Sequence, residues 1–200
     1  MVGRPKEFDP DAALASALDV FWAKGFEGCS MAKLLDEMAI NRQSLYDTFG
    51  DKRALFLAVL NKYMDRVSTD FQAALTTGKT PVARIRNFLK LLSERLTSNG
   101  GHGCLLTNTM VELGPHDETI RQLVAGMWLR LEDALTQLLQ QAVDDRSIKQ
   151  PANPRQVARL LLAVMQGAIV LAKAGMNDAV RDALKAADKM LGDLKSARDK

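Results

Sequence analysis

Arg42, Gln43 and Ser44 are the side chains whose types and positions suggest the most specific chemistry. Arg can form a bidentate pair with guanine and Gln with adenine, while Ser can hydrogen-bond to a base or to the backbone. All three follow Asn41, a favourable N-cap, and therefore stand at the start of a helix. A second short helix before this one would complete the arrangement with which a helix–turn–helix reads base edges in the DNA major groove.

The side chains around this helix include further candidates for DNA contact. We predict that Tyr46 and Thr48 bind phosphate groups. Lys52 begins the next helix, where its charge and the free backbone amides would act on the same phosphate backbone. Ser30 and Lys33 are expected to hold the opposite side of the site.

The first eight residues, MVGRPKEF, have no apolar periodicity and are predicted to form a mobile arm. Arg4 lies in this arm and could reach phosphates or the narrow minor groove. A terminal arm without a contact role is the alternative. The complete set predicted to contact DNA is Arg4, Ser30, Lys33, Arg42, Gln43, Ser44, Tyr46, Thr48 and Lys52.

Three helical patterns must hold these side chains in place. Residues 9–25 begin with a cap followed by proline and end at a glycine. Ser30 is the expected cap of residues 30–38, where apolar residues recur at helical spacing. In the helix after Asn41, Leu45 and Phe49 are assigned to the core. We therefore predict a DNA-binding domain over residues 1–52, with the helix–turn–helix at about residues 29–49.

The rest of the chain carries helical patterns, and nothing in it reads as a strand. Asp51 is expected to cap a connecting helix over residues 51–77, long enough to leave the DNA-binding unit. Thr80 and Asn153 each precede a proline and repeat the cap-then-proline start, and Asn177 is expected to cap the last helix. We predict an all-α fold of about nine helices, with a larger helical domain over residues 78–200.

The helix expected after Asn153 is apolar over an unusually wide arc, so it needs a second partner besides its own core. Gly167 and Ala168 would let another helix approach it closely. We therefore predict that the last two helices form a homodimer face, a four-helix contact between two chains. The residues assigned to this face are Leu160, Val164, Gly167, Ala168, Leu171, Leu184 and Leu191.

The composition is that of a soluble globular protein, with 47% hydrophobic and 26% charged residues in a chain of 200. No run reaches the roughly 18 apolar residues of a membrane span, so we expect a cytoplasmic protein without a membrane partner. The net charge of +3 is small, so DNA affinity must come from locally placed cations. Cys29 and Cys104 are expected to be free thiols.

At residues 8–63 the sequence resembles the DNA-binding domain of the TetR family of bacterial transcriptional regulators. The specific part is SLYDTFGDKRALF, where six residues fall at the family's spacing: Leu45, Tyr46, Phe49, Gly50, Lys52 and Leu55. The resemblance implies a repressor that binds a palindromic operator in double-stranded DNA as a dimer. It also implies release by a small-molecule inducer, which the sequence does not identify.

Two residues depart from the family pattern. Ala39 occupies the turn position where glycine is usual, and if that residue needs a positive φ, alanine strains the turn by roughly 1 kcal/mol. Cys29 stands where threonine is frequent. Neither change removes a predicted DNA contact.

Large, adaptable side chains at helical spacing in the second domain could line a hydrophobic ligand cavity, with ordinary core as the alternative. The family resemblance favours a cavity. The residues assigned to it are Phe88, Leu92, Cys104, Met110, Met127, Trp128 and Met165.

Cys104 supports an alternative, a thiol-based regulator that senses electrophiles or oxidants. It follows His102 and opens a short predicted helix, so free amides and a histidine would favour its thiolate. A buried, inert cysteine is the alternative interpretation.

An enzyme is the competing class of protein. The sequence has no metal-ligand spacing, phosphate-binding loop or nucleophile elbow, so no catalytic residue, metal or cofactor is expected.

Overall fold

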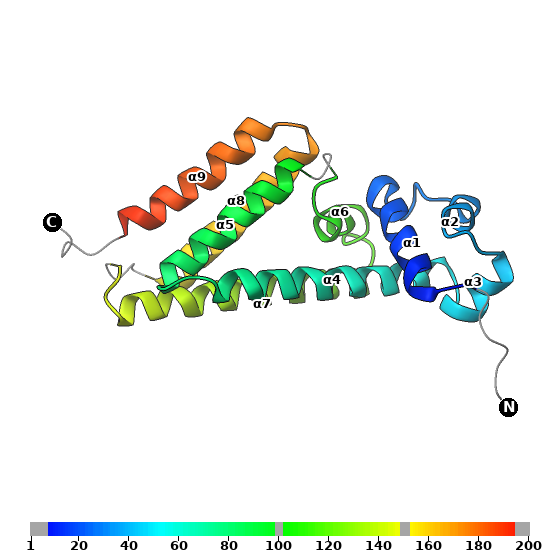
Figure 1. Cartoon of the computed structure of the whole chain (residues 1–200), viewed down its shortest axis with the longest axis horizontal. Helices are drawn as coiled ribbons and strands as arrows, with labels where there is room; N and C mark the ends of the chain where they lie inside the picture. The colour runs from blue at the N-terminus through cyan, green and yellow to red at the C-terminus, as the bar shows by residue number, and fades with distance from the viewer. Residues whose placement is uncertain (1–7, 99–101, 149–152, 195–200) are drawn as a thin grey trace, which may run out of the picture.

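The computed structural model describes residues 8–98, 102–148 and 153–194, and within these ranges it contains nine helices and no β-strand. This confirms the predicted all-α fold. Arg4 lies outside the described residues. Figure 1 shows the order of the helices, which are α1 (Pro10–Lys24), α2 (Met31–Glu37), α3 (Arg42–Phe49), α4 (Lys52–Thr76), α5 (Pro81–Ser98), α6 (Leu105–Glu112), α7 (Glu118–Asp144), α8 (Pro154–Lys173) and α9 (Asn177–Asp193).

Most helices begin at the expected capping residue. In seven of them the side chain before the helix accepts a hydrogen bond from a backbone N–H of the first turn, and these caps are Asp9, Ser30, Asn41, Asp51, Thr80, Asp117 and Asn153. The prediction for Asn177 is wrong, because it is the first residue of α9 and not its cap. Met176 takes that position, since its carbonyl accepts the bond from the Val180 N–H.

The buried side chains form two clusters, which we call the N-terminal core and the C-terminal core. The N-terminal core joins residues of α1 to α4 with residues of α6 and of the first half of α7. The C-terminal core joins the end of α4 with α5, α8, α9 and the rest of α7. Because α4 contributes Leu55 to one and Phe71 to the other, this single helix connects both cores.

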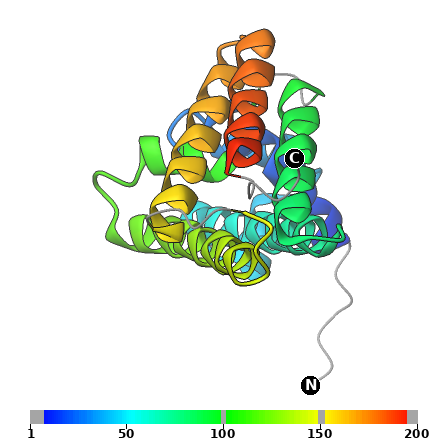
Figure 2. The ribbon, with the colours of Figure 1, turned by 90° about the vertical axis from the view of Figure 1, so that its left-hand side faces the viewer.

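The molecule is elongated, with α1 to α3 at one end and α5, α8 and α9 at the other (Figure 1). Both long helices, α4 and α7, run along the long axis. The end view in Figure 2 shows α5, α8 and α9 rising from the layer that α4 and α7 form. Helix α6 is short and lies between the two ends, next to α1.

Helix α8 is, among the described residues, the one helix long and apolar enough by length and composition to cross a membrane, with a mean hydropathy of 1.4. It packs against both α7 and α9, and Leu161 and Met165 lie in the C-terminal core. The same composition is found in core helices of soluble proteins, so the hydropathy of α8 is weak evidence for a membrane.

Candidate DNA-binding interface and ligand cavity

The start of α3 presents polar side chains on an apolar support. Arg42 and Gln43 are exposed and Ser44 is half-buried. Asn41 holds this turn by accepting the Ser44 backbone N–H at 2.8 Å. Leu45 is fully buried, so the opposite face of α3 is anchored in the N-terminal core. The geometry leaves the first turn of α3 accessible to a groove.

Two of the side chains predicted to contact DNA are engaged by carboxylates of their own helices. The Gln43 amide donates to Asp47 at 2.8 Å, and Lys33 pairs with Glu37 at 2.6 Å. The hydrogen bond to Glu37 raises the pKa of the Lys33 ammonium. Both pairs are exposed, so their free-energy cost of separation in water is small.

The remaining candidates surround α3. Tyr46 is 45% exposed and Thr48 is half-buried. Ser30 serves as the N-cap of α2, where its hydroxyl accepts the Lys33 N–H at 3.2 Å. Lys52 stands in the first turn of α4 as expected, but its Nζ lies 4.5 Å from the centre of the Phe26 ring. Its ammonium must leave that ring to reach a phosphate.

The turn between α2 and α3 does require a positive φ at Ala39, the condition under which the sequence predicts strain. Ala39 has a φ of 53°, in the left-handed region that favours glycine. Cys29, the other departure from the family pattern, is 1% exposed, and burial raises the pKa of its thiol. Cys29 is therefore a packed, protonated side chain.

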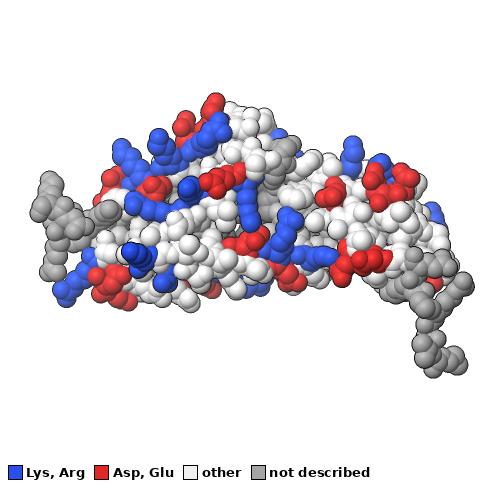
Figure 3. Space-filling model, viewed as in Figure 1, with Lys and Arg blue, Asp and Glu red and all other residues white. Residues whose placement is uncertain are grey.

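Charge at this end of the molecule is not basic overall. Residues 1–52 contain six Lys and Arg against nine Asp and Glu. On the face shown in Figure 3, basic side chains gather over α9 and α5, at the far end from α3. The predicted binding of DNA at this end would therefore depend on a few well-placed cations rather than on bulk charge.

A cavity of about 460 Å³ opens between α1, α4, α5, α6, α7 and α8. Its wall includes six of the seven residues predicted to bind a ligand, namely Phe88, Leu92, Cys104, Met127, Trp128 and Met165. Met110 was wrongly included. It packs in the N-terminal core near the end of α6, where its sulfur lies close to Gly114.

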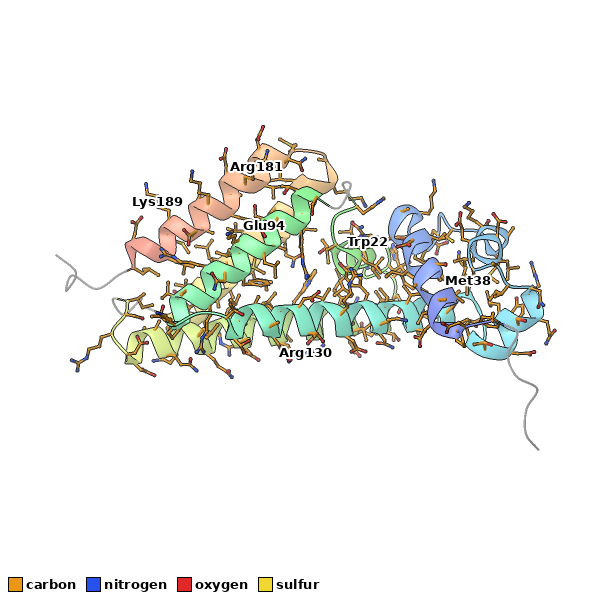
Figure 4. The ribbon with its side chains drawn as sticks, in the orientation of Figure 1. Trp22, Met38, Glu94, Arg130, Arg181 and Lys189 are labelled. Atoms are coloured by element: carbon orange, nitrogen blue, oxygen red, sulfur yellow. The ribbon has the colours of Figure 1, made fainter. Side chains whose placement is uncertain are left out.

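Sequence reasoning missed the part of the wall that comes from the other end of the chain. Trp22 of α1 and Tyr63 and Arg66 of α4 also line the cavity. Trp22 precedes Cys104 by about eighty residues, and no local pattern indicates that α1 and α6 meet. Figure 4 shows Trp22 between α1 and α6.

Cys104 lies in the cavity wall at the N-terminus of α6, where its side chain makes no capping hydrogen bond. The Tyr63 hydroxyl donates to its sulfur at 3.6 Å. Burial, reinforced by Cys104, raises the pKa of Tyr63 far above its usual range, so this hydroxyl stays protonated. The imidazole of His102 packs 6.1 Å from the Trp22 ring, measured between ring centres.

Two polar contacts connect the end of the molecule that carries α1 to α3 with the helices around the cavity. The Glu112 carboxylate, in the last turn of α6, accepts the backbone N–H groups of Phe26 and Glu27 at 3.1 and 2.8 Å. Arg53 of α4 donates to Asp117, the cap of α7. Because Cys104 lies at the other end of α6, this helix connects the cavity wall to the loop before α2.

The predicted dimer face is partly corrected by the structure. Ala168, Leu184 and Leu191 are at most 3% exposed and pack in the chain's own C-terminal core, so they have no surface left for a partner. The four other residues keep accessible surface on α8. Leu160 is 48% exposed, Gly167 is exposed, and Val164 and Leu171 are half-buried.

Two family models match the chain. The model described as bacterial regulatory proteins, tetR family, matches residues 13–59. The model described as tetracyclin repressor-like, C-terminal domain, matches residues 81–187, which is more than half of the chain. The two matches correspond to the DNA-reading end and to the helices around the cavity.

Similar proteins include named regulators. The HTH-type transcriptional repressor ComR of Escherichia coli (strain K12) is 30% identical over 177 residues, or 88% of this chain and 84% of ComR. An uncharacterised HTH-type transcriptional regulator of Bacillus subtilis (strain 168), YezE, is 33% identical over 144 residues, or 72% of this chain and 74% of YezE.

Among solved structures, a cysteine mutant of the TetR family transcriptional regulator CifR, complexed with 26-bp double-strand operator DNA, superposes with a TM-score of 0.83. It is 26% identical, and the superposition covers 94% of this chain and 98% of CifR.

Proposed function

The chain belongs to the tetR family of bacterial regulatory proteins, and on this premise we propose that it is a ligand-responsive repressor. It binds a palindromic operator as a homodimer, and a small-molecule inducer in the cavity releases it. The observation that carries this proposal is α4, which begins beside the DNA-reading helix and continues into the cavity wall.

The proposed DNA interface is the exposed surface of α2 and α3. Arg42 and Gln43 read base edges, because their side chains leave the first turn of α3 without competing core contacts. Tyr46, Thr48, Ser30 and the N-terminal arm with Arg4 hold phosphates, as do Lys33 and Lys52 once they leave Glu37 and Phe26. The complex of CifR with operator DNA is the structural precedent for this assignment.

The proposed division of labour follows the two family matches and the course of α4. Residues 1–52 form the DNA-binding domain, residues 51–77 the connecting helix, and residues 78–200 the ligand-binding and dimerisation domain. The N-terminal core also contains Leu105 and Ile120, so the first domain is packed directly on α6 and α7. A shift of α6 or α7 in the cavity wall therefore moves the DNA-reading helices that pack on them.

The proposed mechanism is a change in spacing. Ligand favours a position of α4 and α6 that alters the distance between the two α3 helices of the dimer. DNA requires that distance to be about 34–36 Å or a multiple of it, so differential affinity of the ligand for the two spacings is sufficient.

We propose that the dimer forms through the accessible face of α8, which Leu160, Val164, Gly167 and Leu171 share. Burial of this face explains why α8 is more apolar than its own core requires.

Because the family is one of transcriptional regulators, we propose regulation rather than catalysis as the activity of this chain, with the bacterial cytoplasm as its location.

The position of Cys104 in the cavity wall favours a second candidate, a thiol that senses electrophiles. N-ethylmaleimide should then weaken operator binding by the parent but not by Cys104→Ser. Cys29 serves as the internal control because it is 1% exposed. Equal release of both proteins would remove the thiol from the mechanism.

Selection of bound fragments from genomic DNA tests the proposed function. The full chain is expected to enrich fragments that share one palindrome, with half-sites about 10 base pairs or a multiple apart. An Arg42→Ala, Gln43→Ala double variant should enrich no common site. Recovery of unrelated fragments by the parent chain would refute the proposal.

A further inference from the structure

The cavity combines a long apolar wall with a small group of charged residues. The apolar part comes mainly from Phe71, Phe88, Leu92, Leu131 and Ile169. The charged residues in the wall are Arg66, Asp70 and Arg95. Asp70 and Arg95 form a salt bridge of 2.8 Å, and this hydrogen bond lowers the pKa of Asp70. Asp70 therefore stays ionised, and the charged wall carries one positive charge in excess.

That excess charge is the guanidinium of Arg66. It lies 5.9 Å from the centre of the Trp22 ring and 5.5 Å from that of the Tyr63 ring. Among the described residues, it has no salt bridge or hydrogen bond. Contact with two aromatic rings holds the guanidinium in this corner of the cavity, and the fork of its N–H groups matches a carboxylate.

Trp22, whose ring centre lies 5.9 Å from the Arg66 guanidinium, carries a second donor. Its indole nitrogen, Nε1, is buried and has no hydrogen-bond partner within the described part of the chain. Buried donors are almost always paired in native proteins, so an unpaired one in a cavity wall indicates an acceptor supplied from outside the chain. The Tyr63 hydroxyl, which stays protonated and donates to Cys104, adds a neutral group to the same part of the wall.

We propose that the cavity binds an apolar monocarboxylate, with its head group at Arg66 and Trp22 and its apolar part along Phe88 and Leu92. This inference rests on the proposed function, because it names the class of the inducer. The single excess positive charge matches one carboxylate, whereas a phosphate monoester dianion would need a second free cation. A volume of about 460 Å³ is in the range of small-molecule sites, roughly 300–1,000 Å³.

The location of the head group also links the ligand to DNA binding. Trp22 lies in α1 and Arg66 in α4, and both helices contribute residues to the N-terminal core. A carboxylate held between them contacts the DNA-reading unit directly. The ligand thus needs no relay through the far helices to change the relative position of α1 and α4.

Tryptophan fluorescence gives a direct test, because the chain has two tryptophans and both Trp22 and Trp128 line the cavity. The probes are decanoate, 1-decanol and decylamine below their micelle concentrations at pH 7.5, titrated into the full chain without DNA. Decanoate is expected to change the fluorescence with a Kd at least tenfold below that of either other probe. Equal affinities, or no response to decanoate, would overturn the inference.

Variants locate the head group. Arg66→Gln should abolish the preference for decanoate, and Arg66→Lys should retain part of it because the charge remains. Trp22→Phe should weaken decanoate several-fold, with Trp128 as the remaining reporter. Arg181→Gln removes the same charge from α9, outside the cavity wall (Figure 4), and should leave the preference intact. A preference that survives in folded Arg66→Gln would contradict the assignment.

Operator binding measured beside these titrations separates the two proposals. If all three probes bind equally and all release operator, the regulator stands and the carboxylate preference fails. If decanoate binds with the expected preference but operator affinity does not change, the cavity assignment stands and ligand control of DNA binding fails.

Discussion

Ala39 adopts a left-handed backbone conformation that is unfavourable for a residue with a β-carbon. A φ of 53° costs a residue with a β-carbon about 1–2 kcal/mol. Glycine would remove this strain, but it would also increase the conformational entropy of the unfolded chain, which offsets part of the gain. We expect Ala39→Gly to raise the free energy of unfolding by about 0.5–1 kcal/mol in urea titrations. The control is Ala32→Gly in α2, which should lower it by about 1 kcal/mol. Destabilisation by both variants would show that the turn is unstrained.

Arg42 is the residue whose loss should separate specific from general DNA binding. Arg42→Ala is expected to weaken binding to the selected operator by about 1–3 kcal/mol while barely changing affinity for random duplex. Lys52→Ala should instead weaken both duplexes and flatten the salt dependence of binding. Fluorescence anisotropy on both duplexes measures these effects. Equal losses on the two by Arg42→Ala would mean that Arg42 only touches phosphate.

Individual residues could be predicted from the sequence where a local rule applies. The caps Ser30 and Asn41 could be predicted because each satisfies amides within three residues of itself. Trp22 and Arg66 could not be assigned to the cavity, because their role depends on α1 meeting α6, and no local pattern encodes that contact. Met110 was assigned wrongly, because helical spacing does not show which of two neighbouring cores a side chain enters.

Helix α6 is the element expected to carry the ligand signal. Both oxygens of Glu112 accept backbone N–H groups of the loop before α2, whereas a glutamine has one acceptor only. Glu112→Gln should lower the free energy of unfolding by about 1–2 kcal/mol and reduce the effect of a cavity ligand on operator affinity. Glu118→Gln, on the exposed start of α7, is the matched control. An unchanged ligand effect in Glu112→Gln would exclude this route.

The elements themselves followed from periodicity, capping residues and prolines, and the long α4 was expected from its uninterrupted stripe. The face of each helix was harder to assign. Leu184 and Leu191 were predicted at a dimer contact, yet α9 uses that stripe to pack on α5 and α8. A stripe shows that a helix is covered on one side, but not whether its own chain or a partner covers it.

Assembly of the whole molecule as a dimer is proposed to depend on the accessible face of α8. A β-carbon at Gly167 would meet no heavy atom within 4 Å, so the protomer itself leaves open space at this position. Gly167→Arg is therefore expected to yield folded monomers in sedimentation analysis and to lower operator affinity at least tenfold, since one half-site alone remains engaged. Gln72→Arg adds the same charge on exposed α4 and should stay dimeric. A dimeric Gly167→Arg would move the interface elsewhere.

The proposed coupling of the cavity to the DNA-reading helices requires reciprocity between ligand and operator. Operator affinity is measured by fluorescence anisotropy with and without a saturating ligand identified by tryptophan fluorescence, and ligand affinity with and without operator. Operator and ligand are expected to weaken each other's binding by the same factor, at least tenfold. A single operator Kd, whether or not the cavity is filled, would contradict this coupling.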